Sequence, residues 1–188
     1  MSKVIGGMTI SLDGFVNDRN GDVSRLYPDL AALVETEILQ ESIKKTGAVV
    51  MGRHAYDMAN GDFTGYEFQT PIFVLTHHVP EQVAKGENEN LSFTFVTEGI
   101  ESAVAKAKAA AGDQDIEVIG GANIIQQCLK AKLLDELQIG IMPVILGQGL
   151  ALFEHLETEQ IELEKKQVIE SPAGRTDILF RVVKEKSL

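Results

Sequence analysis

The sequence lacks the features that mark secreted and membrane proteins. A single Cys in 188 residues cannot form an internal disulfide, so the thiol content does not indicate an oxidising compartment. No segment approaches the roughly 20 consecutive apolar residues that a membrane-spanning helix needs. The Met1–Leu12 stretch also lacks the basic flank and long apolar run of a secretion signal. We therefore expect a cytoplasmic protein with no role at a membrane.

Positive charge is scarce, because 17 Lys and Arg face 28 Asp and Glu and the formal net charge is −11. Such an excess of acid repels phosphate backbones, and no basic patch offsets it, so we expect no nucleic-acid partner. The chain has no Gly-x-x-x-x-Gly-Lys-Ser/Thr loop, and its four His form no metal-binding pattern. We expect neither a nucleotide triphosphatase nor a metal site.

The hydrophobic residues, 44% of the chain, follow two alternating patterns. Short runs rich in β-branched residues alternate with longer stretches whose apolar residues recur at helical spacing, which predicts an α/β fold on a largely parallel sheet flanked by helices. We expect one domain over residues 1–188. The expected strands are Val4–Ile10, Ala48–Met51, Ile72–Leu75, Phe93–Val96, Glu117–Ile119 and Glu136–Ile145, and the expected helices are Asp29–Lys45, Ile100–Ala111 and Ala122–Lys132.

The end of the chain has a different pattern. Strand-type alternation is visible in Gln160–Glu170 and Arg175–Lys184, which are joined by the turn residues Ser171-Pro172-Ala173-Gly174. This pattern predicts an antiparallel C-terminal hairpin at the edge of the sheet. Apolar sheet edges are commonly covered or paired, so we expect a homodimer.

Gly120 and Gly121 lie where an expected strand passes into an expected helix. Glycines there let the backbone approach a ligand closely, and the free N–H groups at the start of the helix suit a pyrophosphate. A tight turn between strand and helix also needs glycine for steric reasons alone. Taken by itself, this motif supports both interpretations equally.

A second strand passes through Gly52 into a helix at Met51-Gly52-Arg53-His54. Arg53 then lies in the first helical turn, where a cation is unfavourable unless an anion is bound or a carboxylate is near. Contact with a phosphate is one explanation. Pairing with one of the many surface acids is the other, and the sequence alone does not decide between them.

Together these two motifs resemble the dinucleotide-phosphate motifs of dihydrofolate reductases, in the same order. The segment Met8–Val16, which contains Ser-Leu-Asp-Gly, looks like the signature of the RibD C-terminal-domain family. Pro143–Phe153 is similar to the Pro-x-x-x-Gly-x-Gly-x-x-Leu-Phe segment of that family. The family contains the pyrimidine reductase of riboflavin biosynthesis and many small stand-alone relatives of unassigned substrate. The conjunction of four motifs is far more specific than any one of them.

The resemblance implies a dihydrofolate reductase-like fold with NADPH across the carboxyl ends of the central strands, where open α/β sheets bind ligands. It implies that the start of the last expected helix cradles the pyrophosphate, and that a later loop holds the adenosine ribose and its 2′-phosphate. The cofactor-binding residues that it implies are Leu12, Gly52, Arg53, His54, Thr76, His77, Gly120, Gly121, Ala122, Asn123 and Ile124.

The sequence departs from the pattern of dihydrofolate reductases at three places. Ala55 replaces a hydroxyl residue that would bind phosphate. His77 and His78 replace Arg, and because an unperturbed His is mostly neutral at pH 7, they are equally compatible with a solvated loop; NADP preference therefore rests on the resemblance. Thr36 occupies the place of the folate-binding carboxylate, which disfavours folate as substrate.

Asp13 is the candidate catalytic residue. In a loop directly after an apolar strand, its carboxylate could position a substrate amine or relay a proton to a ring nitrogen. The alternative is structural, because Asp-Gly is a common turn pair and the side chain can cap the turn. Cys128 lies on the apolar face of its helix and is expected in the core.

The resemblance implies an NADPH-dependent reductase that transfers hydride to a small heterocyclic or conjugated substrate. One alternative is the 5-amino-6-(5-phosphoribosylamino)uracil reductase of riboflavin biosynthesis, whose phosphate would need basic residues beyond Arg19 and Arg25. A second is a non-catalytic dinucleotide-binding module, which the substitution at Ala55 and the missing folate carboxylate would suit.

Overall fold

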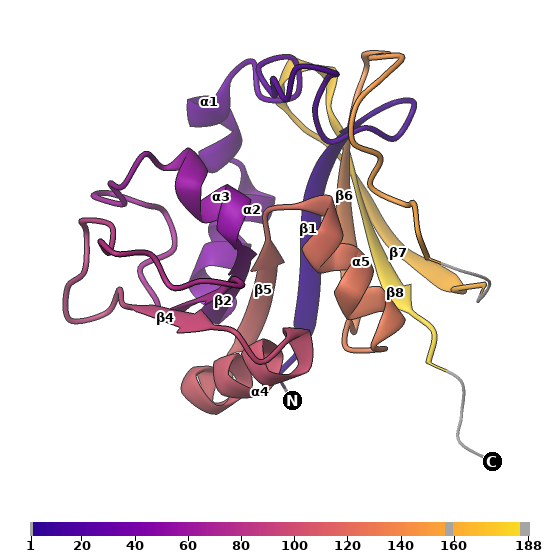
Figure 1. Cartoon of the computed structure of the whole chain (residues 1–188). Coiled ribbons are helices and arrows are strands. Elements are labelled where there is room, and N and C mark those ends of the chain that lie inside the picture. Colours follow the sequence, from indigo (N-terminus) through magenta and orange to yellow (C-terminus); the bar gives the residue numbers. More distant parts are fainter. Residues whose placement is uncertain (1, 157–159, 185–188) are drawn as a thin grey trace.

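The computed structural model describes residues 2–156 and 160–184, and its strands form one sheet flanked by helices (Figure 1). The strand order is β4-β3-β2-β5-β1-β6-β8-β7. The strands are β1 (Val4–Ser11), β2 (Thr46–Gly52), β3 (Ile72–Leu75), β4 (Phe93–Val96), β5 (Asp115–Ile119), β6 (Glu136–Met142), β7 (Leu163–Glu170) and β8 (Thr176–Val182), and the helices are α1 (Leu30–Val34), α2 (Glu37–Lys45), α3 (Arg53–Met58), α4 (Ile100–Ala111) and α5 (Ala122–Lys130).

The sheet is parallel from β4 to β6 and antiparallel at its last two strands. β1 pairs in parallel with both β5 and β6, and β2 pairs in parallel with β3 and β5. β8 runs antiparallel to β6 and to β7, so the hairpin completes one edge. This arrangement confirms the expected mixed, mostly parallel sheet with an antiparallel C-terminal hairpin.

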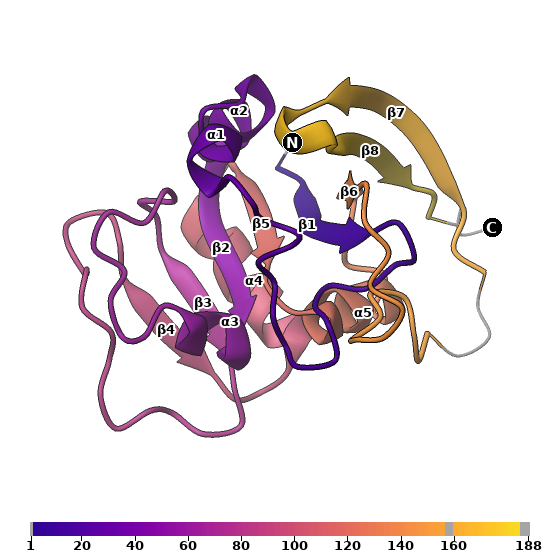
Figure 2. The ribbon, with the colours of Figure 1, turned by 90° about the horizontal axis from the view of Figure 1, so that it is seen from above.

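Alternate residues of the strands face two different cores. Ala48 and Val50 of β2 belong to a core that contains residues of α4 and α5, whereas Val49 and Met51 belong to a second core with Tyr56 of α3. In the view from above, α4 and α5 lie on one face of the sheet, and α1 and α2 lie on the other (Figure 2). Side chains of period two therefore divide the sheet into two environments.

The expected helix from Asp29 to Lys45 is wrong in one respect, because the structure has two short helices there. α1 ends at Val34, and Thr36 begins a new helix. The Thr36 hydroxyl accepts a hydrogen bond from Leu39 N at 3.4 Å and donates one to Leu33 O at 2.7 Å, so it caps α2. The apolar spacing continues across the break, which explains the single helix in the sequence prediction.

The strand expected to run to Ile145 ends at Met142. Pro143 follows, and a proline has no N–H to donate to the next hydrogen bond between the strands.

The turn expected before β8 is a 3₁₀ turn over Pro172–Gly174 in which Ala173 has a φ of 60°.

β7 is an edge strand whose Leu163 and Val168 side chains are exposed. Dimerisation through this edge stays a prediction.

Among the helices of the described ranges, none has the length and apolarity to cross a membrane.

Candidate active site

The four sequence motifs meet at one end of the sheet. Gly14, just after β1, accepts a hydrogen bond from Leu152 N at 2.9 Å. The Gln126 side chain of α5 donates to Leu152 O at 2.9 Å, which ties the same late loop to the helix that follows the Gly-Gly turn. Gly52 N in turn donates to Gly120 O at 3.3 Å. Motifs that are far apart in sequence are therefore joined through a continuous series of contacts.

Two glycines allow the turns after β2 and β5 to touch. A Cβ on Gly120 would lie 2.3 Å from the Ala55 Cβ, and Gly120 also has a φ of +81°. A Cβ on Gly52 would lie 2.9 Å from Ile124 Cγ1. Both positions therefore require glycine for packing reasons, and Ala55, which replaces the expected hydroxyl residue, fills the space above Gly120.

The start of α5 presents its backbone, with no capping side chain, to a neighbouring cleft. Gly120 and Gly121 line the cleft, and the N-cap residue Gly121 has a φ of 99° and no capping side chain. Asn123 does not supply a cap, because its Oδ1 accepts a hydrogen bond from Gln127 farther along α5. The first N–H groups of α5 and the positive end of its dipole thus suit an anion. Ala122 and Ile124 are buried beneath this turn.

Arg53 joins α3 to the loop after β3. Its Nε donates to Asp57 Oδ1 at 2.8 Å and its Nη1 donates to His78 O at 2.9 Å. The buried Thr76 donates its hydroxyl to the same carbonyl at 2.9 Å, whereas His77 is exposed. The pairing with a surface acid is therefore real, but an exposed pair of this kind is weak and leaves Arg53 able to meet an anion. Arg53 Nη2 has no hydrogen-bond partner within residues 2–156 and 160–184.

Asp13 holds two loops together. Its carboxylate accepts hydrogen bonds from Ser11 Oγ at 2.6 Å and from the backbone N–H groups of Gly147 at 2.7 Å and Leu146 at 3.1 Å. The bond from Ser11, followed by those from the two N–H groups, holds the pKa of Asp13 below its ordinary value. Its neighbour Leu12 is 65% exposed. A catalytic role for Asp13 stays a prediction, and the contacts show how it positions the loop.

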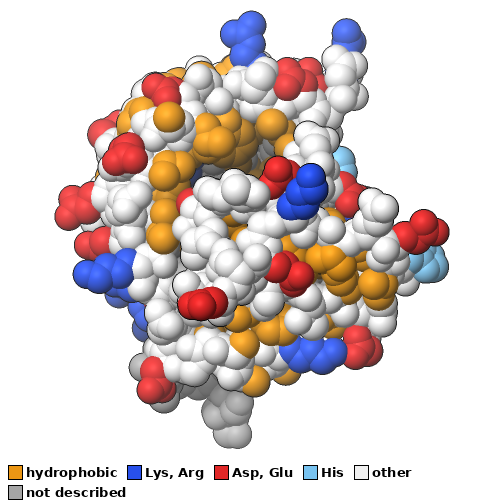
Figure 3. All heavy atoms as spheres, turned by 90° about the vertical axis from the view of Figure 1, so that its left-hand side faces the viewer, with side chains coloured by type: hydrophobic (Ala, Val, Ile, Leu, Met, Phe, Trp, Pro, Cys, Tyr) orange, Lys and Arg blue, Asp and Glu red, His pale blue; other side chains and the backbone are white. Residues whose placement is uncertain are grey.

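A cleft of about 600 Å³ lies beside these motifs. It is lined by Met51 and Ile119 at the carboxyl ends of β2 and β5, by Met8 of β1 and by the exposed His54. Figure 3, which views the side of the molecule that carries α1 and α3, shows a hollow bordered by hydrophobic side chains. In the part of the chain that the structure describes, no three His, Cys, Asp or Glu side chains are grouped to hold a metal ion.

A smaller pocket of about 150 Å³ continues from this cleft between the sheet and the helices α1 and α2. We call it the inner pocket. Met8, Tyr27 and Ile119 line both spaces. Polar side chains of the central strands line the inner pocket, among them Thr9, Glu117 and Gln138. Arg175 and Ser42 also line it.

Glu117 is the buried acid of the inner pocket and was not anticipated from the sequence. It is 5% exposed, and its Oε1 accepts a hydrogen bond from Ser42 Oγ at 2.6 Å. Burial raises the pKa of Glu117 to about 7; the hydrogen bond from Ser42 opposes this rise, and the charges of Asp115 and Glu136 add to it. The sequence feature that points to Glu117 is a single acid within the otherwise apolar run Ile116–Ile119. A polar residue at a buried strand position needs a partner or a function.

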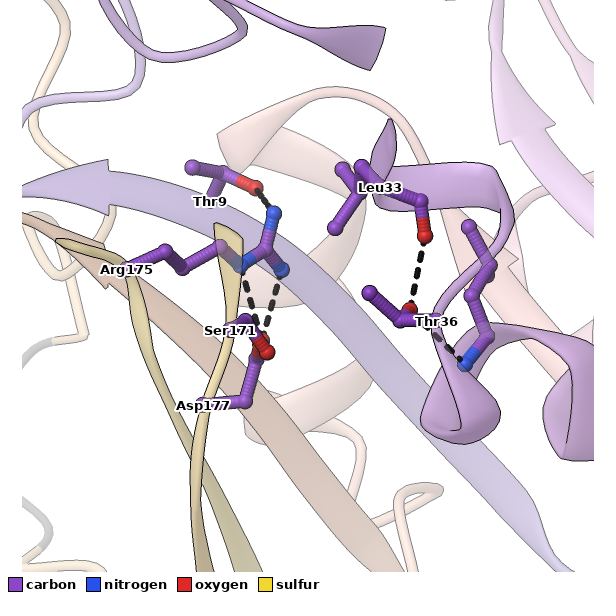
Figure 4. Close-up of polar contacts among 7 residues, drawn as sticks. Thr9, Leu33, Thr36, Ser171, Arg175 and Asp177 are labelled. Carbon is purple, nitrogen blue, oxygen red and sulfur yellow. Dashed lines mark hydrogen bonds and ion pairs between the residues drawn. The ribbon is translucent and has the colours of Figure 1, made fainter. Parts of the chain in front are cut away.

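Arg175 is the second polar group that the sequence did not single out. Its Nε and Nη2 donate to Asp177 Oδ1 at 2.9 and 2.7 Å, and its Nη1 donates to Thr9 Oγ1 at 2.8 Å (Figure 4). Ser171 Oγ donates to the other carboxylate oxygen of Asp177 at 2.6 Å. The guanidinium lies against Gly140, where a Cβ would collide with it. Its positive charge is thus matched within the fold.

A model of the RibD C-terminal domain family matches residues 2–175, a range that contains all four motifs. The chain belongs to this family. The resemblance stated from the sequence motifs is therefore confirmed.

This chain is similar to a protein of nearly the same length and to two proteins whose structures have been solved. The uncharacterized protein YyaP of Bacillus subtilis (strain 168) is 27% identical over 185 residues, 95% of this chain and 94% of YyaP. A Thermotoga maritima diaminohydroxyphosphoribosylaminopyrimidine deaminase/5-amino-6-(5-phosphoribosylamino)uracil reductase is 15% identical with a TM-score of 0.72, over 97% of this chain and 57% of that one. Enterococcus faecalis dihydrofolate reductase complexed with NADP(H) is 15% identical with a TM-score of 0.61, over 97% of each chain. The two structures confirm the dihydrofolate reductase-like fold.

Removal of the Asp177 charge tests the buried ion pair. Asp177→Asn leaves the Arg175 cation without its counter-charge, and an unpaired buried charge costs about 3 kcal/mol of unfolding free energy. Urea unfolding measures this loss. Glu41→Gln is the control, because it breaks the exposed Glu41–Lys45 pair and should change stability little. Equal effects of the two substitutions would contradict the structural role of the pair.

Stability as a function of pH tests the state of Glu117. In the folded protein this carboxyl keeps its proton to about pH 7, whereas in the unfolded chain its ordinary pKa is 4.5. Folding takes up a proton between these values, so the free energy of unfolding falls as pH rises through this range. The stability of Glu117→Gln relative to wild type should rise by roughly 2–3 kcal/mol between about pH 5 and pH 8.

Urea unfolding at both pH values measures this difference. Glu89→Gln, in an exposed loop, is the matched control and should differ from wild type equally at both pH values. A constant difference between Glu117→Gln and wild type would show that Glu117 ionises normally in the folded state.

Proposed function

We propose that this protein is an NADPH-dependent reductase that acts on a small heterocyclic or conjugated substrate. One observation carries the proposal: the two glycine turns touch beside an apolar cleft, with an uncapped helix start after one turn and Arg53 in the first turn of the helix after the other. Family membership adds support, and so does the fold shared with a dihydrofolate reductase complexed with NADP(H).

The residues at this end of the sheet fit a dinucleotide. The pyrophosphate would meet the N–H groups at Gly121 and the start of α5, where no side chain competes for them. Arg53 would meet the ribose phosphate, Thr76 would position the loop after β3 through its hydrogen bond to His78 O, and His77 would lie at the exposed rim. When bound, the cofactor supplies a hydride, and the protein supplies orientation and a dry cleft.

Asp13 acts in this proposal as a positioning residue. Its carboxylate is ionised at neutral pH and both of its oxygens accept hydrogen bonds from the protein. It therefore holds the loop around Gly147 beside the end of β1, close to the exposed Leu12. In this arrangement the two loops form the mouth of the site.

The 5-amino-6-(5-phosphoribosylamino)uracil reductase alternative has less support. That substrate carries a phosphate that needs a cation, and the guanidinium of Arg175 in the inner pocket is already matched by Asp177. A non-catalytic module would bind NADPH without oxidising it in the presence of any reducible heterocycle.

Binding of NADPH tests the proposal directly. We expect quenching or enhancement of NADPH fluorescence and a rise in Tm, since a ligand at about 100 times its Kd stabilises the native state by roughly 2.7 kcal/mol. Arg53→Ala should weaken binding about tenfold or more through loss of a charge-assisted phosphate contact. Gly120→Ala should weaken it further, because the new methyl group pushes α3 away from the turn.

Arg181→Ala is the matched control, because Arg181 is also an exposed arginine paired with an acid, Glu164, but it lies on the C-terminal hairpin. It should bind NADPH as wild type does. Failure of wild type to bind NADPH at millimolar concentration would overturn the proposed function.

A further inference from the structure

The helices α1 and α2 bury less of themselves than the other helices of the chain. No residue of either one, all of them described, is buried, whereas α4 buries five residues and α5 buries six. Burial of apolar side chains is the main source of local stability, and segments with little of it open most readily. We propose that residues 27–45, which we call the strap, open and close over the inner pocket and close over a single planar ring.

Both ends of the strap are fixed to the rest of the fold. Leu26, just before the strap, is 1% exposed, and Thr46, just after it, begins β2. The next residue, Gly47, packs so closely that a Cβ there would lie 2.7 Å from Gln114 Cβ. Movement is therefore confined to the part of the chain between these two points.

The strap has a break in its middle, where α1 passes into α2. α1 has five residues and ends at Val34, and the Thr36 side chain caps α2 while it donates to Leu33 O (Figure 4). A helix this short has little stability of its own. The break lets α1 and α2 change their relative angle while the hydrogen bonds inside α2 are kept.

Two open spaces lie between α2 and the sheet. One is the inner pocket, and the other is a groove of about 540 Å³ that is also lined by Ile5 of β1 and Gln167 of β7. Ile38 and Ser42 of α2 line both spaces. The face of α2 that is directed at the sheet therefore lies partly over cavities, and a cavity supplies no partner atoms for dispersion attraction.

Ser42 attaches α2 to the sheet. Its Oγ donates to Glu117 Oε1 of β5 at 2.6 Å. Among the described residues, the other hydrogen bonds that side chains of α1 and α2 make stay within the strap, such as the bond from Gln40 Nε2 to Val34 O at 2.8 Å. A single bond of this kind holds the strap in place at modest strength, so it can break and form again.

The strap supplies an apolar wall of the inner pocket. Leu33 and Leu39 line this pocket, and Tyr27 and Leu30 line both it and the larger cleft. Leu30 is 56% exposed. The pocket volume of about 150 Å³ matches one six-membered ring. Closing over such a ring would bury the Leu30 side chain, which favours the closed form when the ring is present.

Movement of the strap would control the junction between the two spaces. Tyr27 and Leu30 line this junction from the strap, and Met8 and Ile119 line it from the sheet. In the closed form, water is excluded from a ring that lies beside the cleft, which suits hydride transfer. This role in a reaction rests on the proposed function, whereas the movement itself does not.

Hydrogen exchange read by mass spectrometry tests the opening. We expect the amides of α2 to exchange at least about 100-fold faster than those of α4, after correction for intrinsic rates, because the strap opens without unfolding of the sheet. Low concentrations of urea should speed exchange in α4 and leave α2 nearly unchanged, since opening exposes little surface. Equal protection of the two helices would show that the strap opens only when the whole protein unfolds, and would overturn the proposal.

Ser42→Ala tests the attachment of the strap. Loss of the hydrogen bond to Glu117 should speed exchange in α2 by about threefold to tenfold and leave α4 unchanged. Ser171→Ala is the matched control, because Ser171 Oγ also donates to a carboxylate at 2.6 Å, that of Asp177, but lies on the C-terminal hairpin. It should leave α2 unchanged. Equal acceleration of α2 and α4 in Ser42→Ala would indicate a general loss of stability and contradict the role of this bond.

Phenol tests the closing. It is a single six-membered ring, and it is neutral at pH 7 because a phenolic hydroxyl has a pKa near 10. With phenol at about ten times the Kd found by calorimetric titration, exchange in α2 should slow about tenfold, since the strap can open only after the ring leaves. Unchanged exchange in α2, or no binding of phenol at millimolar concentration, would show that the strap does not close over a ring.

Leu30→Ala tests the same step through affinity. This exposed side chain becomes buried only on closing, so its truncation should raise the Kd of phenol about tenfold. Leu163→Ala removes an exposed leucine of β7 and is the matched control, with the Kd of wild type. If Leu30→Ala also binds phenol as wild type does, the strap does not close.

NADPH binding to wild type keeps this inference separate from the proposed function. If NADPH binds and α2 shows the exchange described above, both are supported. If NADPH binds but α2 is as protected as α4, or phenol leaves α2 unchanged, the inference is wrong and the proposed function stands. If NADPH does not bind while the strap opens and closes over phenol, the proposed function fails and the strap is still a moving part of the fold.

Discussion

The structure depends on the different character of the two faces of its central strands. Residues of β5 and β6 such as Val118 and Leu137 pack into the core that contains α4 and α5. Their neighbours Glu117 and Gln138 face the opposite side, where the inner pocket separates the sheet from α1 and α2. Because buried polar groups need partners, this face cannot close into a dry core, and a pocket at the middle of the sheet follows from the alternation.

The two ends of the site have opposite electrical character. Around the two glycine turns, the start of α5 and the Arg53 guanidinium provide positive potential in a protein whose net charge is −11. A Debye length of about 8 Å at physiological salt means that distant surface acids scarcely oppose an anion bound there. Inside, Glu117 supplies an acid while the charge of Arg175 is matched by Asp177. The site therefore suits a ligand that is anionic at the rim and a hydrogen-bond donor within the inner pocket.

Rigid connections hold these ends in place. The close packing of Gly120 against Ala55 fixes α3 relative to the turn before α5. The carboxylate of Asp13 fixes the loop around Gly147. Gly120 allows close approach because it has no side chain. The ionised carboxylate of Asp13 holds its two segments together through hydrogen bonds.

The sequence by itself determined the α/β class, the parallel centre, the terminal hairpin and the family, since period-two runs, turn residues and four local motifs carry that information. It located the glycine turns at Gly52 and Gly120 but could not show that they touch. The break of the helix at Thr36 was hidden because the apolar spacing continues across it. Only the tertiary structure decided the inner pocket. Ser42, the partner of Glu117, lies 75 residues away in sequence, and Thr9, which binds Arg175 from β1, lies 166 residues away. No local pattern encodes contacts that depend on how strands are ordered in the sheet.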